Sequence, residues 1–265
     1  MVVWVLLTHD VDWPRHGPGV DHILARRGRF PPGVVEAVLR EGFNPYYGVW
    51  RVAELEEGFG FRSTFFFRPV YDDGTGVECY EDDVRGLVRG GWEVGVHLND
   101  VGSVEGVVRQ VGAVESLLPP GRRVVGCRVH YLRIGVSDYW KLREAGLRYD
   151  SSLKAFRDRV SAEDMGFRVI DGVVVFPITI MDAYLFTYMR VSEEHVVDVV
   201  EEALRVAEAL PREPRIVTIL WHDSSINMVG GRAYGRVLEH LHVREGVKVL
   251  RCVDALKLVK GAVES

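Results

Sequence analysis

The feature that most constrains the fold of this chain is a series of short, continuous apolar segments that alternate with segments of helical periodicity. Unbroken apolar strands are typical of a parallel sheet that is buried on both faces. Helices between such strands provide the crossovers that parallel pairing requires. We expect strands at Val2–Thr8, Ser63–Phe67, Trp92–His97, Arg123–Cys127, Val173–Phe176, Ile216–Trp221 and Val247–Leu250.

Helical patterns occupy residues 103–118, 137–146 and 192–210. In the last, apolar residues recur every three or four positions behind Ser192, which we expect to cap the helix. The chain is therefore predicted to be an α/β protein whose parallel sheet closes into a barrel or stays open. In either case the active site is expected at the carboxyl ends of the strands.

Polar side chains do follow the expected strands at that end. Four separate apolar runs end in His, Asp or Arg, where solvated loops would typically show Lys, Glu, Ser and Gly. The residues are His9, Asp10 and Asp12; His97, Asn99 and Asp100; Arg128, His130 and Arg133; and His222 and Asp223.

Each of these residues also has a purely structural interpretation. A single His after a strand is more often a hydrogen-bonding residue than a ligand. Asp10 and Asp12 could form a turn, and Arg128 could be a structural ion-pair partner. Their occurrence together favours function.

The group has a coherent chemical use around a divalent cation. Imidazole and carboxylate suit zinc, and a catalytic zinc site has about three protein ligands and an open position. Asp12 and His97 would be ligands, and Asp10 would be the base for a water made more acidic by the metal. His222 could protonate a leaving group, while Arg128 would keep the base ionised. This combination predicts a metal-assisted hydrolase.

Composition excludes several other classes. The chain has 265 residues and 47% hydrophobic content, which allows one large domain over 1–265. A net charge of -5 gives no basic footprint for nucleic acid. The three cysteines favour a reducing compartment over a disulfide framework. The first apolar run ends too soon in charge to be a signal peptide or a membrane span, so we expect a cytoplasmic protein.

The motifs resemble those of the polysaccharide deacetylase family, also called the NodB-homology or carbohydrate esterase 4 group. "THDVD" is similar to the first motif of one branch, "EVGVH" to the second and "CRVHYLR" to the third. This resemblance implies that Asp10 is the catalytic base, that Asp12 and His97 bind the metal, and that Arg128 holds the base. The backbone N–H of Tyr131 would help to bind the oxyanion.

Two later segments extend the resemblance to about residue 223. "GLRYDSSL" resembles the fourth motif and makes Asp150 the expected orienting acid for the last His. "ILWHD" resembles the fifth and makes His222 the general acid. The family implies a distorted (β/α) barrel, here of about seven parallel strands, and removal of acetyl groups from N-acetylated sugars with a divalent metal. That metal is expected to be zinc, with cobalt, nickel or manganese possible.

The sequence departs from the family at one ligand. The family spaces two ligands as His-x-x-x-His, but Val101 stands four residues after His97. We expect His130 to be the third ligand, with Asp100 and Asp182 as alternatives.

The resulting hypothesis is a deacetylase that cleaves non-peptide amide bonds of a carbohydrate or a small molecule, with Trp13 and Tyr131 as substrate-stacking residues. One alternative is a deacetylase-like barrel that has lost its metal and binds carbohydrate or a partner. Another is a haloacid-dehalogenase-like phosphatase, whose Asp-x-Asp motif also follows a first strand. That class needs a later Lys and has no use for the His-rich strand ends. The sequence predicts neither the substrate nor the oligomeric state.

Overall fold

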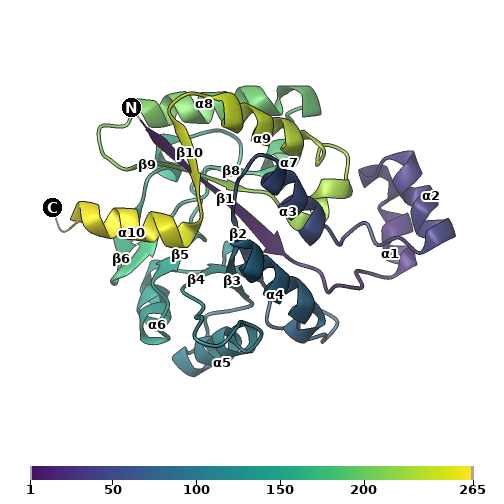
Figure 1. Cartoon of the computed structure of the whole chain (residues 1–265), viewed down its shortest axis with the longest axis horizontal. Coiled ribbons are helices and arrows are strands. Elements are labelled where there is room, and N and C mark those ends of the chain that lie inside the picture. Colours follow the sequence, from purple (N-terminus) through teal and green to yellow (C-terminus); the bar gives the residue numbers. More distant parts are fainter. Residues whose placement is uncertain (1, 264–265) are drawn as a thin grey trace.

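The computed structural model of the protein describes residues 2–263, and its strands and helices alternate along most of the chain (Figure 1). The strands are β1 (Val3–Val11), β2 (Thr64–Phe67), β3 (Glu93–Leu98), β4 (Gly126–Val129), β5 (Tyr149–Asp150), β6 (Arg168–Ile170), β7 (Val173–Val175), β8 (Ile180–Met181), β9 (Arg215–Leu220) and β10 (Val247–Leu250). The helices are α1 (Val20–Ala25), α2 (Pro32–Glu41), α3 (Val49–Gly58), α4 (Glu81–Gly90), α5 (Val104–Glu115), α6 (Tyr139–Glu144), α7 (Asp182–Thr187), α8 (Val196–Glu208), α9 (Ala233–Val243) and α10 (Cys252–Val263).

The strands form one mostly parallel, curled sheet in the order β6-β7-β5-β4-β3-β2-β1-β9-β8, and β10 pairs with β1. Only β6 and β7 pair antiparallel. The first strand is central, because its residues pair with β9, β10 and β2. Within the described residues no pairing joins β6 to β8, so the sheet is a half-barrel rather than a closed barrel. The predicted α/β class and parallel sheet are confirmed.

All seven expected segments contain strands, and three further strands, β5, β6 and β8, were missed. These strands have only two or three residues, too few to show a period. The first strand also runs farther than expected, to Val11, so His9 and Asp10 lie within it.

The expected helices are present, but one predicted cap is wrong. Ser103 caps α5 by accepting a hydrogen bond from the Gly106 N–H. Ser192 does not cap α8, because a 3₁₀ turn at Glu193–His195 comes between them. Its hydroxyl lies 2.8 Å from Nδ1 of His195 instead.

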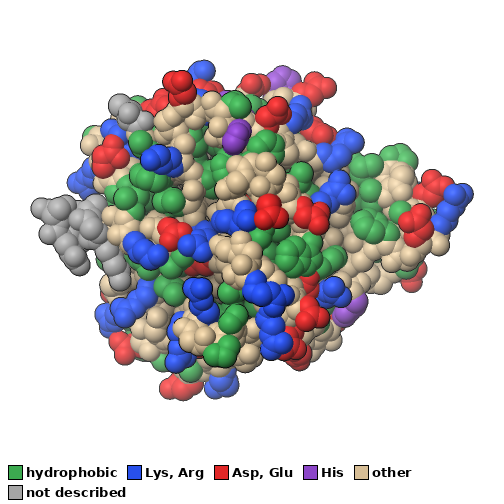
Figure 2. All heavy atoms as spheres, in the orientation of Figure 1, with side chains coloured by type: hydrophobic (Ala, Val, Ile, Leu, Met, Phe, Trp, Pro, Cys, Tyr) green, Lys and Arg blue, Asp and Glu red, His purple; other side chains and the backbone are tan. Residues whose placement is uncertain are grey.

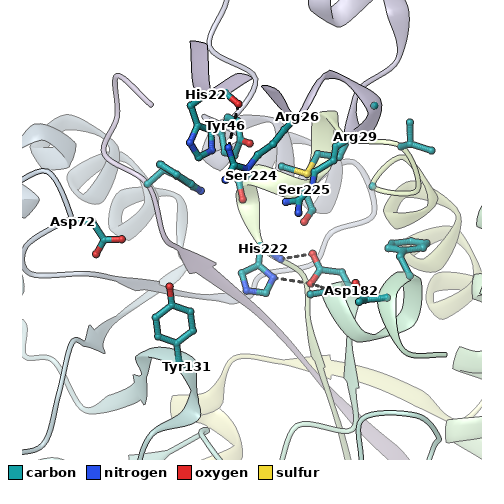
Figure 3. A pocket seen from close by; sticks show the side chains of 18 residues that line it. His22, Arg26, Arg29, Tyr46, Asp72, Tyr131, Asp182, His222, Ser224 and Ser225 are labelled. Carbon is teal, nitrogen blue, oxygen red and sulfur yellow. Dashed lines mark hydrogen bonds and ion pairs between the residues drawn. The ribbon is translucent and has the colours of Figure 1, made fainter. Parts of the chain in front are cut away.

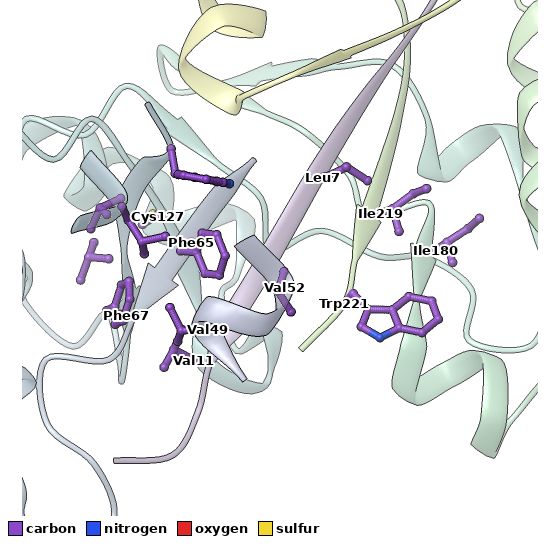
Figure 4. Close-up of a cluster of buried hydrophobic side chains, with 14 of the residues drawn as sticks. Leu7, Val11, Val49, Val52, Phe65, Phe67, Cys127, Ile180, Ile219 and Trp221 are labelled. Carbon is purple, nitrogen blue, oxygen red and sulfur yellow. The ribbon is translucent and has the colours of Figure 1, made fainter. Parts of the chain in front are cut away.

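The two faces of the sheet carry two separate hydrophobic clusters. Leu7 and Phe65 belong to the outer cluster beneath the surrounding helices, part of which Figure 4 shows. Leu6 and Phe66 belong to the inner cluster, which α10 covers. Because side chains alternate along a strand, Thr8 and Asp10 follow Leu6 onto the inner face. The sequence period thus directs the polar end of β1 into the half-barrel.

Large aromatic rings fill the inner face where neighbouring strands carry glycine. A Cβ at Gly95 would lie 2.6 Å from the Phe66 ring, and one at Gly126 would lie 2.0 Å from the Tyr149 ring. The glycine of "EVGVH" is therefore required by packing, and it lies two residues before His97 on the same face.

Residues 14–48 form a lobe that contains α1 and α2 and projects from one side of the half-barrel (Figure 1). Its own small core consists of Ile23, Phe30, Val38 and Tyr46, with Trp13 packed against them. The lobe leaves the sheet directly after Asp12 and returns to it at α3, so it lies beside the carboxyl end of β1.

The surface carries acidic and basic side chains intermixed over the face that Figure 2 shows. No helix among the described residues combines the length and the apolar composition that crossing a membrane would require.

We predict that Leu7→Ala destabilises the protein by about 2.5–5 kcal/mol, because it leaves a cavity beneath the central strand. Leu7 is fully buried, whereas Val243 is 68% exposed and provides a control. Val243→Ala should change the free energy of unfolding by less than about 0.5 kcal/mol. Urea denaturation measures both values, and equal effects would contradict the placement of β1 in the core.

Candidate metal and catalytic site

Three strands deliver the site residues to one edge of the half-barrel through the same alternation. Asp10 and Asp12 are two residues apart at the end of β1, and Arg128 and His130 are two apart at the end of β4. His97 lies on β3, in register with Arg128. The structure therefore brings these five residues together, as the strand ends predicted.

Asp12, His97 and His130 form a triangle of possible metal-binding atoms. Nε2 of His97 lies 3.2 Å from Oδ1 of Asp12, and Nδ1 of His130 lies 3.3 Å from the same oxygen. The two imidazole nitrogens are 3.1 Å apart. Ligands of a tetrahedral zinc ion with bonds of about 2.0–2.1 Å are about 3.3–3.4 Å from one another. The triangle therefore has the size that such an ion requires.

The hydrogen bonds around the triangle also suit a cation. Nδ1 of His97 lies 3.0 Å from the Arg128 carbonyl and donates to it, which leaves the Nε2 lone pair for the triangle. Oδ1 of Asp12 is buried without a hydrogen-bond partner. Burial raises the pKa of Asp12, but His130 and His97 outweigh it, so the pKa is well below its ordinary value. An ionised carboxylate facing imidazole nitrogens is a donor set for a divalent metal.

Asp10 lies beside the triangle and is held by a buried arginine. Oδ1 of Asp10 accepts a hydrogen bond from Nη1 of Arg128 at 2.8 Å, and Oδ2 lies 3.8 Å from Nε2 of His97. Burial raises the pKa of Asp10, but the charge of Arg128 and then that of His97 lower it overall. Asp10 is consequently ionised at neutral pH, with one oxygen turned toward the triangle.

Arg128 itself is fully buried and has a partner for each of its guanidinium nitrogens. Nε donates to the Ser151 carbonyl at 2.6 Å, and Nη2 donates to the hydroxyls of Thr8 and Ser151. Its guanidinium also lies over the Phe66 ring, 4.8 Å from the centroid. These contacts fix the orientation of the Asp10 carboxylate.

His222 lies beside Asp12 of the triangle, and Asp182 orients its ring (Figure 3). Nδ1 of His222 is 2.6 Å from Oδ1 of Asp182, and its Nε2 is 3.6 Å from Oδ2 of Asp12. Burial lowers the pKa of His222, but Asp182 outweighs this and raises it to about 10. The imidazole is therefore protonated at neutral pH and can donate a proton from Nε2.

The prediction that Asp150 orients His222 is wrong. Asp150 lies on β5, where it accepts hydrogen bonds from Ser152 and from the Tyr139 hydroxyl. Burial raises its pKa. Because Ser152 in turn accepts a hydrogen bond from the Val129 N–H, Asp150 supports the end of β4 rather than the last His.

Neither alternative metal ligand joins the triangle. Asp182 uses one oxygen on the His222 ring and the other on the His222 N–H. Asp100 is exposed and accepts a hydrogen bond from the Gly102 N–H. Of the three candidates for the third ligand, only His130 places a possible metal-binding atom beside Asp12 and His97.

Tyr131 occupies a strained position above the triangle. Its φ of 56° is in the left-handed region, which a tyrosine rarely adopts. The residue is 68% exposed, and its ring lies 3.9 Å, centroid to centroid, from the His130 ring. The ring caps the proposed ligand, whereas the role of its backbone N–H stays a prediction.

A buried group behind the site escaped the sequence interpretation. His9, one of the polar residues at the end of the first apolar run, is fully buried, with Nδ1 2.7 Å from the Trp221 carbonyl and Nε2 2.8 Å from Glu56. Tyr234 also donates to Glu56. This group connects β1 to the residue before His222. A fully buried acid on a helix gives no signal in one sequence, because Glu56 stands in a run of ordinary helical acids.

His16, by contrast, lies on the exposed surface beside Asp73.

Two cavities open onto the site and meet beside Tyr131 and His222. The smaller, of about 460 Å³, contains the triangle and Asp10. The larger, of about 770 Å³, extends from Asp182 toward the lobe (Figure 3). Trp13 is among the residues that line it. Both expected substrate-stacking residues, Trp13 and Tyr131, therefore line the larger cavity, although their contact with a substrate stays a prediction.

Comparison with solved structures identifies the fold, although no protein-family model and no curated protein matches the sequence. A candidate polysaccharide deacetylase from Mycobacterium smegmatis aligns over 98% of this chain and 91% of its own, with a TM-score of 0.69 and 17% identity. Puue allantoinase aligns over 96% and 89%, with a TM-score of 0.65 and 17% identity. A candidate polysaccharide deacetylase from Pseudomonas aeruginosa PAO1 aligns over 96% and 90%, with a TM-score of 0.64 and 16% identity. The chain has the NodB-like half-barrel fold of these proteins.

We predict that His130→Ala weakens zinc binding at least about 100-fold, because it removes one of three ligands. His16→Ala, on the exposed surface, and Asp100→Asn should leave zinc affinity unchanged. Competitive titration with a chromophoric chelator measures each value. If His130→Ala kept its affinity and Asp100→Asn lost it, the third ligand would be Asp100.

Proposed function

We propose that this protein is a metal-dependent hydrolase of the polysaccharide deacetylase family that removes an acyl group, most simply acetyl, from the nitrogen of an N-acylated sugar or related small amide. The observation that carries the proposal is the placement of an ionised acid and a protonated imidazole next to a ligand triangle. Asp10 lies beside His97 and His222 lies beside Asp12, and each has its own buried charge partner.

Asp12, His97 and His130 would hold the ion, for which zinc is the first candidate and cobalt, nickel or manganese the next. When bound, such an ion supplies positive charge that polarises an acyl oxygen and makes water more acidic. The unpartnered Asp12 oxygen and the spacing of the triangle support this assignment.

The remaining chemistry belongs to the side chains around the triangle. Asp10 accepts a proton from the attacking water, and Arg128 keeps it ionised and pointed at the triangle. His222 then donates its Nε2 proton to the departing amine, and Asp182 stabilises the imidazolium until that step. The strained Tyr131 backbone is proposed to turn its N–H toward the developing oxyanion.

The fold alone does not decide the substrate, because an allantoinase shares it with candidate polysaccharide deacetylases. Preference for a carbohydrate rests on the aromatic rings of Trp13 and Tyr131 along the cavity.

The absence of a second imidazole at Val101 favours one further candidate, a barrel that binds carbohydrate without catalysis. Val101 is buried among apolar residues and offers no ligand. His130 fills the third position from a different strand end, which favours the enzyme.

We predict that Asp10→Asn lowers turnover by about 10³-fold or more while zinc content stays that of the wild type, since Asp10 acts as base and not as ligand. Asp73→Asn, an exposed replacement of the same kind, is the control. Acetate release from a panel of N-acetylated sugars, together with metal analysis, tests both variants. Full activity in Asp10→Asn would refute the assignment of the base.

We also predict that Asp182→Asn lowers turnover by about 10²–10⁴-fold and moves the alkaline limit of activity to lower pH. The reason is that Asp182 raises the pKa of His222, so its removal makes the imidazolium lose its proton earlier as pH rises. Asp150→Asn should leave that limit in place, because Asp150 does not contact His222. The pH dependence of kcat separates the two acids, and a shift in Asp150→Asn alone would reverse their roles.

A further inference from the structure

The end of the larger cavity that lies away from Asp182 is built by the lobe rather than by the half-barrel. Trp13, His22, Arg26, Arg29 and Tyr46 all line this end, and Figure 3 shows the last four grouped together on the lobe side of His222. Apart from Trp13, which directly follows Asp12, none of them lies at a strand end, and none takes part in the proposed proton transfers. The group needs an explanation of its own.

The two arginines of this group have no acidic partner among the described side chains. Neither Arg26 nor Arg29 lies within ion-pair distance of a carboxylate, and the side-chain hydrogen bond of Arg26 goes to the His22 carbonyl. The two acids of the cavity are already paired, Asp182 with His222 and Asp72 with Arg68. The lobe end of the cavity therefore carries two exposed arginines without an acidic partner among the described side chains.

Two buried polar atoms in the same group also lack partners. The Tyr46 side chain is only 2% exposed, yet its hydroxyl makes no hydrogen bond, and neither does Nε2 of His22. Burial raises the pKa of Tyr46, so the hydroxyl stays protonated and can donate. A buried hydroxyl without a partner costs stability, and a bound ligand can provide the missing partner.

We propose that the substrate carries a phosphate group, and this inference rests on the proposed function. Arg26, Arg29, Tyr46 and His22 bind the phosphate while the acyl amide lies at the triangle. Trp13 directly follows Asp12 and contacts both His22 and Tyr46, with ring centroids 4.9 and 4.8 Å away. It thus connects the two ends of one binding site. A cavity of about 770 Å³ is large enough for a phosphorylated sugar.

Phosphate fits this group better than carboxylate does. A carboxylate has two oxygens and one negative charge, which a single arginine can satisfy through a bidentate pair. A phosphate monoester has three terminal oxygens and nearly two charges at neutral pH. The guanidinium groups of Arg26 and Arg29 match its charge. Together with the neutral side chains of Tyr46 and His22, they also offer enough donors for its three oxygens.

The test measures binding of sugars that have no acyl group, so that it does not depend on turnover. Calorimetry of the zinc-loaded protein with glucose 6-phosphate, glucuronate and glucose separates phosphate, carboxylate and the neutral sugar. We expect glucose 6-phosphate to bind most tightly of the three, and we expect its binding to weaken as the salt concentration is raised. Arg26→Gln/Arg29→Gln should weaken it roughly tenfold or more. Arg27→Gln, on the same exposed turn but outside the cavity, should not change it.

Tyr46→Phe tests the buried hydroxyl separately. Because that hydroxyl has no partner in the protein, its removal should leave unfolding unchanged or raise stability, and binding of glucose 6-phosphate should still weaken. A loss of stability with unchanged binding would mean that the hydroxyl is structural and would contradict its assignment here.

Activity then distinguishes this proposal from the proposed function. N-acetylglucosamine 6-phosphate should release acetate faster than N-acetylglucosamine, and the double arginine variant should lose that advantage. Arginine-dependent binding of glucose 6-phosphate without any acetate release would support the phosphate site and refute the deacetylase. Acetate release with no preference for phosphate, or tighter binding of glucuronate, would overturn the phosphate site alone.

Discussion

The burial of the Arg128 guanidinium is the constraint on which the rest of the site depends. A fully buried charge is tolerated only when it is paired and its donors are all satisfied. Here the ion pair with Asp10 joins β4 to β1, and the bonds to Thr8 and Ser151 bring in the segment after β5. Because each partner stands on the inner face, satisfying Arg128 requires the strand register that also places His97 beside Asp12. The same strand register therefore builds both the core and the site.

The features that could be predicted from the sequence are those that depend on the hydrophobic period and on position at a strand end. The parallel sheet and the meeting of Asp12, His97 and His130 follow from apolar runs that end in polar residues. The partner of His222 could not be predicted this way. Asp182 follows β8, a strand of two residues, and its place beside β9 arises from pairing across the sheet. Asp150 carried the better local motif, but its oxygens are used by Ser152 and Tyr139.

In the proposed site, His130 at the end of β4 supplies the ligand that the His-x-x-x-His spacing would place after β3. The carboxyl ends of neighbouring parallel strands are only about 5 Å apart, so a side chain from β4 reaches a point that the helix after β3 could also supply. Val101 itself is buried in the outer apolar cluster. The missing His-x-x-x-His spacing is thus compatible with a complete triangle, since a metal requires ligand atoms in position and not a particular order in sequence.

In the proposed function, the lobe recognises the substrate and the half-barrel carries the chemistry. Residues at strand ends are fixed by the sheet, so their geometry cannot change without loss of the core. The lobe has its own small core and contacts the segment after β9 through the carbonyls of Arg29 and Pro45, so its cavity-lining side chains stand outside the sheet. Trp13 directly follows Asp12 and packs against the lobe core. It therefore fixes where the lobe lies relative to Asp12. A substrate held by the lobe would therefore reach the triangle at a fixed distance, which is the condition for positioning a reactive amide.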